Sequence, residues 1–294
     1  MRYGVPYKGS KNQIARWIID ILPSAETFID LFAGGCSVTH VAILSNKYKN
    51  IVINDINDTP QLFLDAVSGK YSNEKRWVSR EMFNKLKGTD RYVAQCWSFG
   101  NNGKDYLYGK TIEPWKKALW YARVFQDYSL FKEIGIDTDG SSADIKAHMG
   151  EYWEKYTTWY GDNIRPYKRP WELESLERLE SLERLESLEV SQLDYHDVVI
   201  PENNIVYCDI PYKGRDGYND LPFDHEEFYK WCSIQKEMVV VSEYSMPEDR
   251  FIKIAEKEKR SILDGRGKGH NQKIVLEGLW IPIHQKELWG ELNG

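Results

Sequence analysis

The segment that most constrains the fold is a short apolar run that ends in two glycines and leads into a helical pattern. Residues 28–35 read Phe-Ile-Asp-Leu-Phe-Ala-Gly-Gly, and apolar side chains then recur at helical spacing over 38–44. A second apolar run, 51–53, ends at Asn54-Asp55, and another helical pattern follows it. Strand, helix, strand and helix in this order predict a parallel sheet and the α/β class.

Strand patterns return in the last third of the chain, after a long aromatic-rich interval that Gly, Asn and Lys interrupt. The last two runs flank a glycine-rich turn and predict a terminal hairpin. We therefore expect a Rossmann-like mixed sheet of residues 1–70 and 190–294, interrupted by a mainly helical domain, 71–189. The later strands are predicted over 188–193, 204–208, 237–242, 251–263 and 273–283.

The insertion ends in an uninterrupted Leu-Glu-Ser-Leu-Glu-Arg repeat over residues 173–189. A leucine at every third position fits neither the 3.6-residue period of a helix nor the two-residue period of a strand. On a helix the leucines would spread over about 300° of the circumference. A helix with a break or a short stacked solenoid fits better, and a coding repeat tolerated in a surface element is the alternative.

The formal net charge of −6 is concentrated in that repeat. Residues 172–189 hold seven Glu and two Arg, a net charge of −5, which leaves −1 for the rest of the chain. Residues 75–169 instead hold 17 Lys or Arg against 12 Asp or Glu, together with 19 aromatic residues. Basic and aromatic side chains interleaved in this way suit phosphate contacts and base stacking, whereas a helical domain with an aromatic core is the alternative.

The cysteines and the apolar stretches exclude several other classes. Four widely separated cysteines form no Cys-x-x-Cys pair, so neither a zinc site nor a disulfide framework is expected. No apolar stretch is long enough to cross a bilayer, and no apolar run follows the N-terminus. We expect a cytoplasmic protein that requires no metal and contacts no membrane.

The first half of the predicted sheet has the features of an adenosine-binding crevice. The Gly34-Gly35 turn lets backbone approach a ligand, and Asp55 follows the next strand, where a carboxylate can take both hydroxyls of a ribose. A nucleotide-dependent oxidoreductase would use the same two features. Asp30 lies inside the first strand, where a buried carboxylate needs a partner. The ammonium of a bound methionine moiety would supply one, and capping of the following helix is the alternative.

Asp209-Ile210-Pro211-Tyr212 follow the strand 204–208 and suggest a different chemistry. The exocyclic nitrogen of adenine is a poor nucleophile because its lone pair is delocalised into the ring. Two acceptors for its hydrogens, Asp209 and the carbonyl of Ile210, would favour the state that attacks a methyl sulfonium. Pro211 favours an extended Ile210, and Tyr212 offers a face on which a flipped base can stack. An oxidoreductase would have no use for these four residues.

Over nearly its whole length the chain resembles the DNA adenine methylase family. The resemblance rests on motifs in the family order of cofactor region, recognition insertion and catalytic region. It implies an S-adenosylmethionine-dependent enzyme that flips adenine out of DNA and methylates its amino group, with a cognate restriction endonuclease as a further partner. The matching segments are Tyr7-Lys-Gly-Ser-Lys11, residues 28–35, Asp55, Leu193-Asp-Tyr195 and the tetrapeptide at 209–212.

The same resemblance implies roles for individual residues. Lys11 and Asp30 would hold the methionine part of the cofactor, Asp55 its ribose, and Asp194 or Tyr195 its adenine. The cofactor set is completed by Tyr7, Phe32, Ala33, Gly34 and Gly35. The chain departs from the family at Ile210, where proline is usual: the carbonyl acceptor survives this change, but the fixed φ of proline is lost.

DNA contacts are expected from the glycine- and asparagine-rich loop within residues 97–108 and from a basic turn at 266–270. In the second segment a plain hairpin turn is the alternative. Three other functions remain open: methylation of an RNA base, methylation of a protein glutamine amide, and DNA binding without catalysis. The predicted DNA-binding residues are Asn101, Asn102, Lys104, Tyr106 and Lys268.

Overall fold

The computed structural model describes residues 3–138, 185–212, 223–260 and 274–293, with single positions at 140, 144 and 183. The chain divides into two compact units. The sheet unit comprises Met1–Lys70 and Glu172–Gly294, and the helical unit comprises Tyr71–Trp171. Almost all of the hexad repeat before residue 185, and the turn that contains Lys268, lie outside the described residues.

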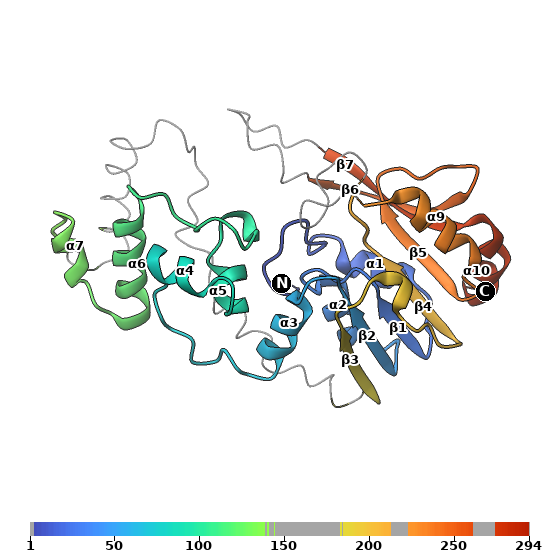
Figure 1. Cartoon of the computed structure of the whole chain (residues 1–294), viewed down its shortest axis with the longest axis horizontal. Coiled ribbons are helices and arrows are strands. Elements are labelled where there is room, and N and C mark those ends of the chain that lie inside the picture. The colour runs from blue at the N-terminus through green and yellow to red at the C-terminus, as the bar shows by residue number, and fades with distance from the viewer. Residues whose placement is uncertain are drawn as a thin grey trace. The chain divides into compact units, whose positions relative to one another are not determined.

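A seven-stranded mixed sheet organises the sheet unit, in the order β3-β2-β1-β4-β5-β7-β6 (Figure 1). The first five strands in this order are parallel, whereas β7 runs antiparallel to both β5 and β6. The predicted α/β class and mixed sheet are confirmed. The strands are β1 (Thr27–Asp30), β2 (Asn50–Asn54), β3 (Ser187–Ser191), β4 (Asn204–Cys208), β5 (Met238–Glu243), β6 (Phe251–Arg260) and β7 (Ile274–Pro282).

Alternation along the central strands separates two buried faces. Ile29 of β1 and Val206 of β4 belong to a cluster that packs beneath Phe228 on helix α9 (His225–Ile234). On the other face, Phe28 stacks against Tyr207 with ring centroids 6.4 Å apart. Both faces of β1 and β4 are therefore closed to water, so polar groups gather where these strands end.

Helices of the sheet unit begin where the sequence supplies a cap or a turn. Asp224 caps α9 by accepting a hydrogen bond from the Glu227 amide, and α2 starts directly after the two glycines. The remaining helical segments are α1 (Ala15–Ile21), α2 (Ser37–Ser45), α3 (Thr59–Val67), η4 (Tyr195–Asp197), η6 (Ile283–Gln285) and α10 (Lys286–Asn293).

Strands β6 and β7 form the hairpin predicted at the end of the chain (Figure 1). Their pairing runs from Phe251 opposite Pro282 to Arg260 opposite Ile274, with an irregularity between Lys253 and Ala255. The hairpin extends the sheet beyond β5, with β7 paired to β5 and β6 at the edge. It places residues from the end of the chain near the tetrapeptide that follows β4.

The helical unit is built around aromatic side chains. Trp77 stacks on Tyr108 with parallel rings 5.6 Å apart, and Trp97 and Trp120 pack edge-on around it. Nine of the 13 aromatic residues that the structure describes within residues 75–169 are buried, which favours the alternative interpretation for them. Its described helical segments are α4 (Arg80–Leu86), α5 (Arg91–Cys96), η1 (Phe99–Asn101), α6 (Glu113–Phe125) and α7 (Ser129–Glu133).

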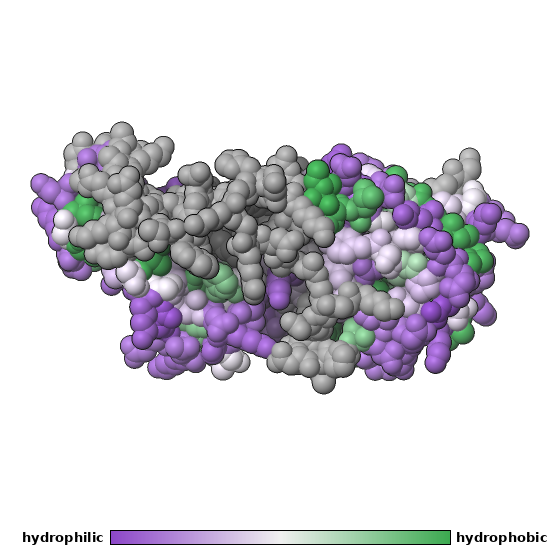
Figure 2. Space-filling model, turned by 90° about the horizontal axis from the view of Figure 1, so that it is seen from above, coloured by the Kyte–Doolittle hydropathy of each residue, from purple (hydrophilic) through white to green (hydrophobic). Residues whose placement is uncertain are grey.

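On the face shown in Figure 2, the described residues are largely hydrophilic, and hydrophobic ones form small, separate patches. Among the described residues, no helix combines the length and apolar character needed to span a membrane. Within the same residues, no three His, Cys, Asp or Glu side chains are grouped as a metal site would require.

Candidate functional site

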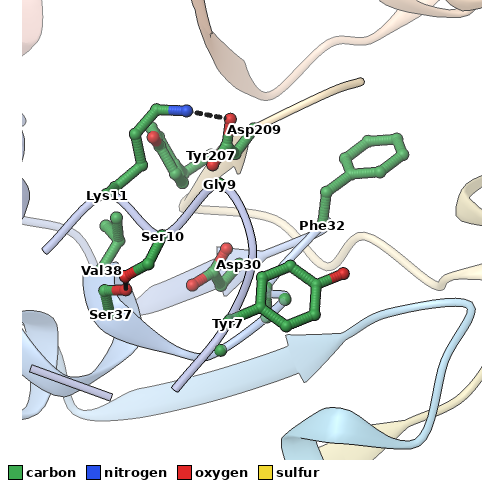
Figure 3. Close-up of a pocket in the computed structure, with 13 residues that line it drawn as sticks. Tyr7, Gly9, Ser10, Lys11, Asp30, Phe32, Ser37, Val38, Tyr207 and Asp209 are labelled. Carbon is green, nitrogen blue, oxygen red and sulfur yellow. Dashed lines mark hydrogen bonds and ion pairs between the residues drawn. The ribbon is translucent and has the colours of Figure 1, made fainter. Parts of the chain in front are cut away.

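A pocket opens where β1 and β4, the two central neighbouring strands, end. After β1 the chain goes on to β2, which lies on one side of this strand pair. After β4 it goes on to β5, which lies on the other side, so the loops after β1 and β4 diverge. In open α/β sheets such a divergence forms a crevice for ligands. Here the pocket is lined by Asp30 and the glycine turn after β1, by Tyr207 and Asp209 of β4 and its end, and by Tyr7 and Lys11 from the N-terminal segment (Figure 3).

The glycine turn is in close contact with the N-terminal segment. Gly34 has a φ of +49°, and a Cβ atom added there would lie 2.6 Å from the Tyr7 ring. A Cβ atom on Gly35 would lie 2.7 Å from the Val5 carbonyl oxygen, and the Val5 amide donates a 2.8 Å hydrogen bond to the Gly35 carbonyl. Both glycines are therefore needed for this contact, which brings Tyr7 into the pocket wall.

Asp30 takes the helix-capping role, one of the two roles that the sequence left open. Its Oδ2 atom accepts hydrogen bonds from the amide of Thr39, in the first turn of α2, at 3.1 Å and from the Thr39 hydroxyl at 2.5 Å. Its Oδ1 atom is buried and has no hydrogen-bond partner among the described residues. Burial raises the pKa of this carboxyl to about 7, because desolvation outweighs the Thr39 bonds. An unsatisfied buried acceptor at a pocket wall is suited to a cationic or hydrogen-bond-donating ligand.

Lys11 lies against the first residue of the tetrapeptide. Its ammonium forms an ion pair with Oδ1 of Asp209, drawn in Figure 3, and donates a 2.8 Å hydrogen bond to the Tyr212 hydroxyl. Burial opposes the charged form of Lys11, but Asp209 and Glu277 outweigh it and raise its pKa. Burial likewise raises the pKa of Asp209, against the opposing effect of Lys11. The resemblance assigned Lys11 to the cofactor; the structure places it in the pocket wall and in contact with Asp209.

The other three residues of the tetrapeptide differ in the contacts of their carbonyl groups and side chains. Ile210 is 1% exposed, and its carbonyl oxygen accepts no hydrogen bond from a described residue. The next carbonyl, that of Pro211, is 2.8 Å from Nε2 of His225 on α9. Tyr212 stacks on Tyr244, just after β5, with parallel rings whose centroids are 4.2 Å apart. An acceptor carboxylate, a carbonyl with no described hydrogen-bond donor and one ring of an aromatic pair thus lie within four residues of the end of β4.

Glu277 of β7 is a member of this site that the sequence analysis missed. Its side chain is fully buried, contacts the Tyr212 hydroxyl at 3.0 Å and forms an ion pair with Lys259. Burial opposes its charge, but Lys11 and Lys259 outweigh it and lower the pKa of Glu277. The sequence did contain a signal: Glu277 is a lone charge inside the apolar run Ile-Val-Leu-Glu-Gly-Leu-Trp-Ile, where a carboxylate needs a buried partner.

Three of the predicted cofactor residues do not line this pocket: Asp55, Asp194 and Tyr195. Asp55 is 5% exposed and accepts a 2.8 Å hydrogen bond from the Gly34 amide, so it already braces the turn. Its second oxygen accepts bonds from the Asn57 amide and side chain. Asp194 caps η4 through the His196 amide. Tyr195 is buried against Phe32, with ring centroids 5.5 Å apart, and only Phe32 of these two lines the pocket.

The predicted DNA-binding residues of the helical unit differ in exposure. Asn102 and Lys104 are exposed, and Asn102 folds the loop into a turn by accepting bonds from the amides of Lys104 and Asp105. Asn101 is 9% exposed and donates to the Gln95 carbonyl. Tyr106 is 8% exposed, and its hydroxyl donates a 2.7 Å bond to the Val78 carbonyl. Tyr106 and Asn101 thus stabilise the loop that presents the two exposed residues.

Residues 7–134 match the family model described as D12 class N6 adenine-specific DNA methyltransferase. This range contains the N-terminal segment, the glycine turn and most of the described helical unit. No curated protein matches the chain.

Proposed function

We propose, from the match of residues 7–134 to the family model of adenine-specific DNA methyltransferases, that this chain is a site-specific DNA adenine methyltransferase. In this proposal the methyl group comes from S-adenosylmethionine and is received by the exocyclic amino nitrogen of an adenine flipped out of DNA. The observation that carries the proposal is that Asp209, followed by an Ile210 carbonyl with no described hydrogen-bond donor, lines a pocket that also contains an unsatisfied buried carboxylate oxygen of Asp30.

The pocket fits the chemistry of that cofactor. S-adenosylmethionine, when bound, supplies a methyl group made electrophilic by its positive sulfur. Asp30 offers Oδ1 to the cofactor's ammonium group, which would satisfy a buried acceptor that has no partner among the described residues. Gly34 and Gly35 let backbone approach the ligand at the start of α2, and Asp55 fixes this turn through the Gly34 amide. In this arrangement the ribose is held at Asp55 and the adenine beside Tyr195 and Asp194.

The tetrapeptide would prepare the amino nitrogen for attack. Asp209 and the Ile210 carbonyl each accept one of its two hydrogens, which favours a nitrogen with a localised lone pair. Lys11 holds Oδ1 of Asp209, so Oδ2 is the oxygen left for the base. The raised pKa of Asp209, caused by burial, makes its carboxylate a better acceptor for the proton that the nitrogen loses. Pro211 holds the Ile210 carbonyl outward, and Tyr212 supplies a face for the base.

The helical unit is the proposed recognition domain. Its exposed Asn102 and Lys104 lie on a turn that Asn101 and Tyr106 brace from below. An asparagine amide can read a base edge, and a lysine can contact phosphate. A restriction endonuclease that cleaves the same DNA sequence would be the partner against which this methylation protects.

The proposal is tested by incubating the full chain with unmethylated genomic DNA and S-adenosylmethionine carrying a labelled methyl group. We expect label at N6 of adenine within one sequence, mapped base by base. Asp209→Ala should slow transfer more than a hundredfold, about 3 kcal/mol in the barrier, and leave cofactor affinity nearly unchanged. Asp20→Ala, at an exposed site on α1, is the matched control and should keep full activity.

Parallel reactions with RNA and with a glutamine-containing peptide separate the competing substrates. Label in RNA or peptide and none in DNA would reject the proposed substrate. DNA binding without transfer would identify a catalytically silent relative. Near-normal transfer by the Asp209→Ala variant would remove this residue from the mechanism.

A further inference from the structure

The buried carboxylate of Glu277 contacts Tyr212, at one end of the tetrapeptide, and Lys11, which binds Asp209 at the other end. It lies in the middle of β7 with no exposed side-chain surface, a position that strongly disfavours an unpaired charge. Ser242 of β5 donates a 2.7 Å hydrogen bond to its Oε1 atom, and the Tyr212 hydroxyl lies 3.0 Å from both carboxylate oxygens. Lys259 and Lys11 place their ammonium groups against the same carboxylate, the latter at 3.4 Å.

We propose that Glu277 is a positioning residue for methyl transfer, which holds Lys11 against Asp209 and fixes Tyr212 through its hydroxyl. The inference rests on the proposed function, because the geometry that Glu277 maintains is that of the group proposed to act on adenine. Glu277 itself does not contact the pocket. It acts through Lys11, which lines the pocket and binds Oδ1 of Asp209.

The contacts of Lys11 show how this positioning works. Its ammonium has three hydrogens and lies among three oxygen-bearing groups, namely Asp209, Tyr212 and Glu277. These three contacts leave the ammonium group little freedom to move. The ammonium group therefore keeps Oδ1 of Asp209 in a fixed position. The carboxylate plane is thereby set, and Oδ2 keeps one direction toward an incoming base.

The Glu277 carboxylate also fixes Tyr212, through the hydroxyl group of that residue. Its ring lies flat against Tyr244 at a centroid distance of 4.2 Å, which limits tilting. Its hydroxyl contacts Glu277 and accepts 2.8 Å hydrogen bonds from Lys11 and from Lys259, which limit sliding in the ring plane. The carboxylate of Glu277 and the ammonium groups of Lys11 and Lys259 therefore hold the hydroxyl of Tyr212.

Removing the charge of Glu277 and removing that of Lys259 should shift the pKa of Asp209 in opposite directions. The negative charge of Glu277 raises the pKa of Asp209, and the positive charge of Lys259 lowers it. Loss of the Glu277 charge should therefore extend activity to lower pH, and loss of the Lys259 charge should withdraw it to higher pH. The described groups that act electrostatically on or with Asp209 are Asp30, Lys11, Tyr207, Cys208, Tyr212, Glu243, Lys259 and Glu277.

The experiment compares full-length wild type with Glu277→Gln and Lys259→Met in single-turnover methyl transfer to unmethylated genomic DNA between pH 5 and 8. Glu277→Gln should lower the plateau rate between about tenfold and a hundredfold, the scale expected when a reacting group is displaced by about 1 Å. The acid limb of the rate profile should shift by about one pH unit, downward in Glu277→Gln and upward in Lys259→Met. Glu258→Gln, exposed on the same hairpin, is the control and should keep both plateau and acid limb.

A structural role alone would lower the amount of active protein equally at every pH, and melting temperatures would report that loss. A Glu277→Gln plateau within about twofold of wild type, or acid limbs that do not move in opposite directions, would overturn the inference. If Glu277→Gln does not fold, an unshifted acid limb in Lys259→Met overturns it. Wild type that transfers no methyl group to DNA rejects the proposed function and this inference with it, whereas active wild type with unaffected variants rejects the inference alone.

Discussion

Replacing Asp30 by Asn should stabilise the protein at neutral pH but weaken cofactor binding. Burial raises the pKa of Asp30 from 3.8 to about 7, so the folded protein binds this proton more tightly than the unfolded chain does. The stability that the group contributes is therefore fully present below about pH 4 and is lost as the pH rises through about 7. A shift of about 3 pKa units at 1.36 kcal/mol each corresponds to about 4 kcal/mol over this range.

Asp30→Asn removes that dependence while it keeps the local bonds. The amide oxygen can accept both bonds from Thr39, and the amide nitrogen replaces the unpaired Oδ1. The free energy of unfolding of the variant, relative to that of wild type, should therefore rise by up to about 4 kcal/mol as the pH is raised from 4 to 8. Urea unfolding at several pH values, with exposed Asp20→Asn as control, measures this difference.

Cofactor affinity should change in the opposite sense. A cationic group at Oδ1 favours the ionised carboxylate, so wild type should release a proton on binding S-adenosylmethionine near pH 6, and Asp30→Asn should bind it more weakly without that release. Calorimetry in two buffers with different ionisation enthalpies detects the proton. A stability difference that is flat across pH would refute the pKa of Asp30, and equal cofactor affinities would refute its role in the pocket.

Three further substitutions test the surrounding framework. Asp55→Ala should weaken the cofactor by about 1 to 3 kcal/mol in a binding titration and leave DNA affinity unchanged, because it removes both the proposed ribose acceptor and the bond to the Gly34 amide; equal cofactor dissociation constants would reject the assignment. Ile210→Pro should keep or modestly raise the transfer rate, since the carbonyl is the working group, and a folded variant with a collapsed rate would contradict this. Gly278→Ala should lower the unfolding free energy by about 1 to 3 kcal/mol in urea, because the added Cβ would lie 2.4 Å from Nε1 of Trp280; unchanged stability would show that the indole moves freely.

The local elements of the sheet unit were readable from the sequence because short-range chemistry decides them. Alternation and apolar runs located the strands, and the glycine pair located the turn between β1 and α2. Boundaries shifted by one or two residues where tertiary pairing overrides local pattern. The first strand was expected to reach Phe32 but ends at Asp30, because the chain turns there toward the pocket. The strand expected from Leu188 begins at Ser187, where it pairs with Asn50.

The helical unit shows the limit of composition. Its aromatic and basic content predicted contacts with nucleic acid, but composition does not say which aromatic side chains are buried. The structure puts Trp77, Trp97 and Tyr106 in the core and leaves Asn102 and Lys104 exposed. Packing against partners distant in sequence decides burial, as the bond from the Tyr106 hydroxyl to the Val78 carbonyl illustrates.

The sequence by itself determined the residue types at the candidate site: a glycine turn after one strand, acidic residues at strand ends, and an Asp-Ile-Pro-Tyr segment after another. Only the tertiary structure decided that Lys11 and Asp209, 198 positions apart, form an ion pair, and that Glu277 and Lys259 of the terminal hairpin join them. The physical reason is that side-chain chemistry and periodicity are local properties, whereas the order of strands in a sheet brings together residues that no spacing in the chain relates.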